Sequence, residues 1–138
     1  MEVRFLLDTN TCIYIRRRRP PELLARFREL RHGEAALSII TYGELYYGAE
    51  KSITRDRALN HLEEFASSIQ VLPLPMEAAR FYRTIRAGLA MKGELIGAND
   101  LWLAAHAAAM DLILVTNNER EFRRVPGLKI ENWIDYAP

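Results

Sequence analysis

The sequence VRFLLDTN at residues 3–10 combines a short apolar run with an abrupt polar end. Apolar runs of this length, bounded by turn-forming residues, are typical of strands that are buried on both faces. We therefore predict a strand over residues 3–7, with Asp8 at its carboxyl end. A carboxylate beside a buried strand is costly unless a cation compensates its charge, so Asp8 marks a candidate functional position.

Three further polar positions lie beside apolar runs in the same way. Glu44 follows SIIT at residues 38–41, Asp100 precedes the apolar segment 101–110, and the patch 118–121 follows LILVT at residues 112–116. Several carboxylates next to buried segments imply either a divalent cation or a strong network of arginines. Which of the two is present decides what this protein does.

Strands and helices are predicted to alternate along the chain. Thr9 or Asn10 is expected to cap the first helix, and Thr41 is expected to cap another in which Glu44 completes a capping box. Asp100 is expected in the first turn of its helix. This pattern predicts an α/β fold with a parallel sheet covered on both faces. The further strands are expected at residues 35–40, 69–74, 112–116 and 129–130, and the helices at 9–17, 22–31, 53–68, 76–91, 101–110 and 119–124.

The bulk composition is that of an ordinary globular protein. The chain has 138 residues, 49% of them hydrophobic and 27% charged, which predicts one domain over residues 1–138. Cys12 is the only cysteine, so an intrachain disulfide and a thiolate zinc cluster are excluded and a cytoplasmic location is expected. The longest apolar stretch, residues 101–110, is interrupted by His106, so no membrane span is predicted.

Positive charge is concentrated near the N-terminus although the net charge is only +1. Four consecutive arginines occupy residues 16–19, and Arg16 and Arg17 are therefore candidates for contact with phosphate groups. A solvated helical face explains the same run equally well. The two interpretations stay open at the level of sequence.

The carboxylates are expected to meet at one edge of the sheet. In open parallel sheets ligands bind outside the carboxyl ends of the strands, and Asp8, Glu44, Asp100 and Asn118 are all candidates for that edge. Crowded carboxylates raise one another's pKa values, and a hard cation that prefers oxygen ligands relieves the repulsion best. The sequence therefore predicts a Mg²⁺ or Mn²⁺ site.

The chain resembles the PIN-domain ribonucleases, and among them the VapC toxins of bacterial toxin–antitoxin pairs. No single motif is specific, but their order and spacing together are. The motifs that carry the resemblance are LLDTN at residues 6–10, IY at 13–14, SIIT at 38–41, GEL at 43–45, GA at 48–49, IGANDLWLAAHA at 96–107, VTNN at 115–118, EF at 121–122, VPGL at 125–128 and ENW at 131–133.

The resemblance implies a PIN-like twisted parallel sheet of about five strands, with Asp8, Glu44 and Asp100 as ligands of Mg²⁺ or Mn²⁺. Many PIN domains have a fourth acidic residue two places after the threonine that corresponds to Thr116. This chain has Asn118 there, which we include in the catalytic set as a neutral oxygen donor, and Glu121 is the nearest acidic substitute. With less negative charge in the site, one tightly held ion is expected.

Hydroxyl and amide side chains near these ligands have two interpretations. Thr9, Asn10 and Thr116 are of the residue types that orient carboxylates or metal-bound waters through hydrogen bonds. They are also ordinary turn and cap residues. Both interpretations remain open for each of the three positions.

The resemblance further implies an activity and partners. It implies metal-assisted hydrolysis of an RNA phosphodiester to leave a 5′-phosphate and a 3′-hydroxyl, with initiator tRNA as a possible substrate. It also implies a VapB-type antitoxin that reaches the acidic residues, and a homodimer. The exact cut site, the number of ions and the identity of the antitoxin do not follow from the sequence.

Three alternatives compete with this interpretation. A phosphatase or dehalogenase also has an Asp after its first strand, but it needs a second Asp where this chain has Asn10. A receiver-type signalling domain also needs a phosphate-binding Lys, and the sequence near Lys129 offers no candidate for it. The non-enzymatic alternative is a PIN-like scaffold that binds RNA or protein without cutting it, with Asn118 marking a decayed site.

Overall fold

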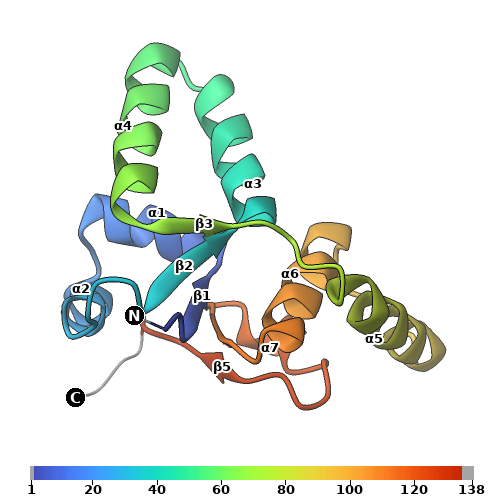
Figure 1. Cartoon of the computed structure of the whole chain (residues 1–138). Helices are drawn as coiled ribbons and strands as arrows, with labels where there is room; N and C mark the ends of the chain where they lie inside the picture. Colours follow the sequence, from blue (N-terminus) through green and yellow to red (C-terminus); the bar gives the residue numbers. More distant parts are fainter. Residues whose placement is uncertain (1, 135–138) are drawn as a thin grey trace.

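A computed structural model of the chain describes residues 2–134 and contains one five-stranded sheet (Figure 1). All its strand pairs are parallel, in the order β3-β2-β1-β4-β5. The α/β fold and the parallel sheet are thereby confirmed, and the carboxyl ends of the strands share one edge. The strands are β1 (Phe5–Leu7), β2 (Ala35–Ser38), β3 (Gln70–Leu72), β4 (Ile113–Val115) and β5 (Ile130–Glu131).

Helices cover both faces of the sheet because successive strand side chains point to opposite sides. Leu6 lies in a buried cluster with residues of α5 and α6. Its neighbours Phe5 and Leu7 lie in a second cluster, with residues of α1 to α4. The helices are α1 (Thr9–Arg17), α2 (Pro21–Arg28), α3 (Ile39–Glu50), α4 (Arg55–Ser68), α5 (Ala78–Lys92), α6 (Ala98–Ala109) and α7 (Glu119–Phe122).

Two helix starts differ from the prediction. Asp8 itself caps α1, since its Oδ1 accepts the Thr11 N–H at 2.8 Å, so the cap is neither Thr9 nor Asn10. At α3 the cap is Ser38, whose Oγ accepts the Ile40 N–H at 3.1 Å. The predicted cap Thr41 lies inside α3 and is buried, so the expected capping box with Glu44 is absent from this helix.

The predicted strand over residues 35–40 is two residues too long, because α3 starts directly after β2. The β-branched pair Ile39–Ile40 favours a strand locally, but the Ser38 cap and packing in the fold place it in a helix. The α3–α4 hairpin rises from the sheet beside β3 (Figure 1). Because α3 follows β2 without a loop, the end of the strand fixes the position of Glu44, six residues further along the chain.

None of the helices within residues 2–134 is both long enough and apolar enough to cross a lipid bilayer.

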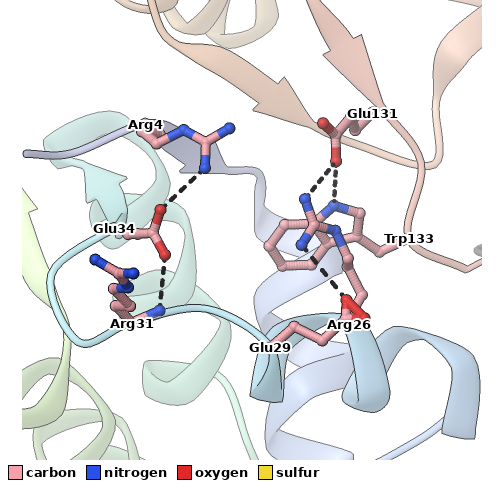
Figure 2. Close-up of polar contacts among 7 residues, drawn as sticks. All are labelled: Arg4, Arg26, Glu29, Arg31, Glu34, Glu131 and Trp133. Carbon is pink, nitrogen blue, oxygen red and sulfur yellow. Dashed lines mark hydrogen bonds and ion pairs between the residues drawn. The ribbon is translucent and has the colours of Figure 1, made fainter. Parts of the chain in front are cut away.

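Arg26 of α2 connects the last strand to the first. Its guanidinium lies 5.2 Å from the ring centre of Phe5 and 5.6 Å from that of Trp133. It also pairs with Glu131 at 3.5 Å (Figure 2). Glu131 also accepts a hydrogen bond of 2.9 Å from the indole N–H of Trp133, whose ring packs edge-on against Phe5. The side chain of Arg26 therefore holds β5 and Trp133 against β1 through packing and charge together.

Replacing Arg26 tests this connection. Arg26→Ala is expected to lower the free energy of unfolding by about 1–2 kcal/mol, because a half-desolvated ion pair and two cation–π contacts are lost. Urea denaturation measures the change. Arg28→Ala, at an exposed position of the same helix, is the control and should shift stability by less than about 0.5 kcal/mol. Equal effects of the two substitutions would show that Arg26 has no special role.

Candidate active site

Asp8 lies at the carboxyl end of β1, the central strand of the sheet, and is 7% exposed. Burial raises the pKa of its carboxyl group, and hydrogen bonds from Thr116 and from the Thr11 backbone N–H partly offset that rise. The negative charge of Glu44 adds to it. Asp8 is therefore a rigidly held carboxylate at the predicted edge, close enough to Glu44 for their charges to interact.

Asp100 lies in the first turn of α6, as predicted, and is half-buried. Its pKa is raised to about 6, first by burial and then by the negative charges of Glu44, Glu121 and Asp8. These three carboxylates come from α3, α7 and the end of β1, which are far apart in sequence. The fold thus brings three other acidic groups near enough to Asp100 for their charges to raise its pKa, and a bound cation would relieve that repulsion.

Glu44 is held by two neighbours. Thr9 Oγ1 donates to its Oε1 at 2.7 Å, and Asn99 Nδ2 donates to its Oε2 at 3.4 Å. The contact from Thr9 supports its predicted role in orienting a carboxylate. Asn99 was missed by the sequence analysis, because nothing in the local sequence indicates a partner 55 residues away.

The segment after β4 contributes Thr116, Asn118 and Glu121. The Thr116 hydroxyl is buried, accepts the Asn118 backbone N–H at 2.9 Å and contacts Asp8. Asn118 itself is the residue before α7, with no cap hydrogen bond from its side chain. The negative charge of Glu121 raises the pKa of Asp100, so Glu121 is the residue of this segment whose charge acts on the site.

Three other predicted residues, Asn10, Arg16 and Arg17, lie on α1. Asn10 is exposed in the first turn, and among the described residues it makes no hydrogen bond to the carboxylates. Arg16 lies in the last turn. With Arg17 it lines a groove of about 940 Å³ that also includes Thr9 and Glu44, so the basic run shares a depression with one carboxylate of the cluster.

The donor set fits a hard divalent cation in its chemistry. All the side chains involved offer oxygen, the ligand that Mg²⁺ and Mn²⁺ prefer. Within residues 2–134 none of the four carboxylates forms an ion pair with a basic side chain, so the arginine network expected as the alternative is not what compensates them there. No three acidic, His or Cys side chains of the described part form a complete metal-binding group. Each Glu44 oxygen accepts one hydrogen bond and keeps a second lone pair, so these contacts leave Glu44 able to bind a cation.

The raised pKa of Asp100 predicts a pH-dependent gain in stability when the charge is removed. Because the folded pKa of about 6 exceeds the ordinary value of 3.8, folding takes up a proton between these pH values, and stability falls as pH rises through them. Asp100→Asn should therefore melt at a higher temperature than the parent at about pH 8, in chelator, with the difference vanishing near about pH 4. An equal difference at both pH values would contradict the raised pKa.

Comparison with known proteins supports the fold. Residues 5–128 match the PIN domain family. Ribonuclease VapC2 of Haemophilus influenzae is 46% identical over 132 residues, which cover 96% of this chain and 99% of that protein. The tRNA(fMet)-specific endonuclease VapC of Salmonella typhimurium is 44% identical over 131 residues, covering 95% and 98%.

Solved structures give the same result. The crystal structure of DNA-bound VapBC from Salmonella typhimurium contains a chain with a TM-score of 0.88 and 44% identity, covering 95% of this chain and 98% of that one. The structure of VapBC2 from Rickettsia felis bound to a promoter DNA fragment gives a TM-score of 0.87 at 35% identity, covering 96% and 99%.

The fold and site define an α/β protein with an acidic cluster at the carboxyl edge of a parallel sheet. The chain belongs to the PIN domain family, and within it to the VapC ribonucleases. The resemblance drawn from the sequence motifs is confirmed.

Proposed function

We propose that Asp8, Glu44 and Asp100 form the catalytic site of a divalent-metal-dependent endoribonuclease. The observation that carries this proposal is that Thr9 and Asn99, the chain neighbours of Asp8 and Asp100, both donate hydrogen bonds to Glu44, which brings the three segments together. The pKa of Asp100, raised to about 6 by burial and by three carboxylates, is consistent with that crowding. Like charges held together at a sheet edge are costly to stability, and cation binding is the function that explains them. The chain is accordingly a PIN-domain endoribonuclease toxin, as its VapC relatives are ribonucleases by name.

Each carboxylate has a role that follows from its surroundings. Asp8 and Asp100 would hold the cation, since Asp8 is fixed by its cap hydrogen bond and Asp100 is ionised above a pH of about 6. A Mg²⁺ or Mn²⁺ ion supplies Lewis acidity, lowering the pKa of a coordinated water and offsetting charge on the phosphoryl oxygens. Glu44, held by Thr9 and Asn99, would complete the ligand set, either directly or through the attacking water that it would orient for in-line displacement. Glu121 would supply the fourth negative charge and Asn118 a neutral oxygen.

The groove beside the cluster is the proposed path of the RNA. It connects Glu44 to Arg16 and Arg17, and these guanidinium groups would contact phosphates on either side of the scissile bond. Asn10, exposed at the start of α1, remains a candidate for contact with the same strand.

The substrate and partners are proposed from the relatives. One similar protein is named a tRNA(fMet)-specific endonuclease, so initiator tRNA is the proposed target. The structural neighbours are VapBC complexes, so a VapB-type antitoxin is the proposed protein partner. We further propose that the protein is a homodimer and acts in the cytoplasm, where tRNA takes part in translation.

Mapping RNA ends tests the substrate. Purified protein is incubated with total tRNA and Mg²⁺, and the fragment ends are sequenced. The expected result is one dominant cut in initiator tRNA that leaves a 5′-phosphate and a 3′-hydroxyl. An elongator tRNA for methionine is the matched control. Metal binding without any cut in tRNA or other RNA would instead favour the non-enzymatic scaffold.

A further inference from the structure

A buried hydrogen bond joins the two helices that carry Glu44 and Asp100. His106 of α6 is fully buried, and its Nδ1 lies 2.8 Å from Oγ of Ser38, the residue that caps α3. Glu44 lies six residues after Ser38, and Asp100 lies six residues before His106. The bond therefore links the start of one ligand-bearing helix to the body of the other.

Ser38 is already engaged on its other side. Its Oγ accepts the Ile40 N–H at 3.1 Å, which fixes the first turn of α3 and leaves one further acceptor site and one proton for the histidine. Either tautomer of a neutral imidazole can complete the pair, with Nδ1 as donor or as acceptor. Because Ser38 bonds both His106 and the first turn of α3, the position of the His106 ring influences the direction in which α3 leaves the sheet.

The surroundings make this bond the dominant polar contact of the ring. Among buried side-chain atoms in the described part of the chain, His106 Nε2 and Thr41 Oγ1 have no hydrogen-bond partner. A buried polar group with an unpaired atom costs stability relative to an apolar side chain of similar size. Leu at position 106 would fill the same space without leaving a buried nitrogen unpaired, so packing does not explain the histidine.

We propose that His106 is a positioning residue, which holds α3 through Ser38 so that Glu44 and Asp100 face the same cation. This inference rests on the proposed metal-dependent function and adds to it a residue that does not touch the reacting atoms. The second contact between the two helices, from Asn99 to Glu44, is longer at 3.4 Å and exposed. The buried bond is the one that water cannot replace.

Mn²⁺ affinity in the absence of RNA tests the proposal. The Mn²⁺ dissociation constant is measured on substrate-free protein for the parent, His106→Leu and His106→Asn. We expect His106→Leu to bind Mn²⁺ about 10- to 100-fold more weakly, the usual effect of losing a partner that orients a ligand. His106→Asn keeps a hydrogen-bonding group near the place of Nδ1, and it should restore affinity to within about threefold of the parent.

The control for general damage to the core is Leu103→Ala on the same helix, at a side chain that is 1% exposed. It should lower the melting temperature and leave Mn²⁺ affinity within about twofold of the parent. Parent-like affinity of His106→Leu would overturn the inference, and so would an equal loss in Leu103→Ala or a failure of His106→Asn to restore binding. If the parent itself binds no Mn²⁺, the proposed metal site is wrong and the inference falls with it.

A double-mutant cycle keeps the proposal testable if His106→Leu does not fold. Ser38→Ala removes the other end of the bond, and Ser38→Ala with His106→Ala should bind Mn²⁺ no more weakly than Ser38→Ala alone. Amide hydrogen exchange supplies a readout independent of metal: loss of the bond should speed exchange in the first turn of α3 and leave α5 unchanged. Additive losses of affinity, or unchanged exchange in α3, would overturn the proposal.

Discussion

Asp8→Asn and Asp100→Asn are each expected to lose RNA cleavage by about 10³-fold or more while remaining folded. Loss of one preorganised charge-stabilising group commonly costs about 10²- to 10³-fold, and these carboxylates would also fix the position of the cation. Asn is as good a helix cap as Asp, so Asp8→Asn should keep the hydrogen bond to the Thr11 N–H. Initial rates of tRNA cleavage at fixed Mg²⁺ measure the loss.

Stability separates a catalytic site from a structural one in the same variants. Breaking a buried ion pair typically costs about 3–5 kcal/mol, whereas removing one of several repelling carboxylates should leave stability unchanged or raise it. Asp56→Asn is the matched control, since this side chain is exposed in the first turn of α4. It should cleave at the parental rate. Cleavage that survives both site substitutions would point to a contaminating nuclease or to a different site.

Removal of divalent cations is expected to abolish cleavage, and Mg²⁺ or Mn²⁺ added back should restore it. The same ions should stabilise the folded protein, by about 2.7 kcal/mol when the free concentration is one hundred times the dissociation constant. Asp100→Asn should show a smaller gain, because one ligand and part of the charge repulsion are missing. Thermal melts with and without Mn²⁺, run beside cleavage assays in chelator, measure both effects. Full activity in excess chelator would contradict the proposed mechanism.

The strands and the acidic edge could be predicted from sequence because each signal is local. An apolar run of five or six residues that stops at a polar residue predicts a buried strand, and the parallel arrangement then places Asp8 and Asp100 at one edge. The helix start at Ser38 was missed because Ile39 and Ile40 continue the pattern of a buried strand. Local pattern alone does not distinguish the last strand residue from a helix cap there.

The hydrogen-bond partners around the carboxylates could not be predicted for a different reason. Asn99 contacts Glu44 across 55 residues, and His106 contacts Ser38 across 68, so neither pair has a signature in the local sequence. In the sequence, His106 stands in an otherwise apolar helix, where a histidine is more often a satisfied core residue than a ligand. Its partner becomes evident only when α6 is packed beside α3, which is a property of the tertiary fold.

Anomalous diffraction from crystals soaked in Mn²⁺ shows whether the acidic cluster holds a cation, because anomalous scattering distinguishes manganese from water and lighter ions. We expect a peak about 2.0–2.3 Å from carboxylate oxygens of both Asp8 and Asp100, with Glu44 bound directly or through one water. A peak at another place, or no peak at Mn²⁺ concentrations that support RNA cleavage, would contradict it.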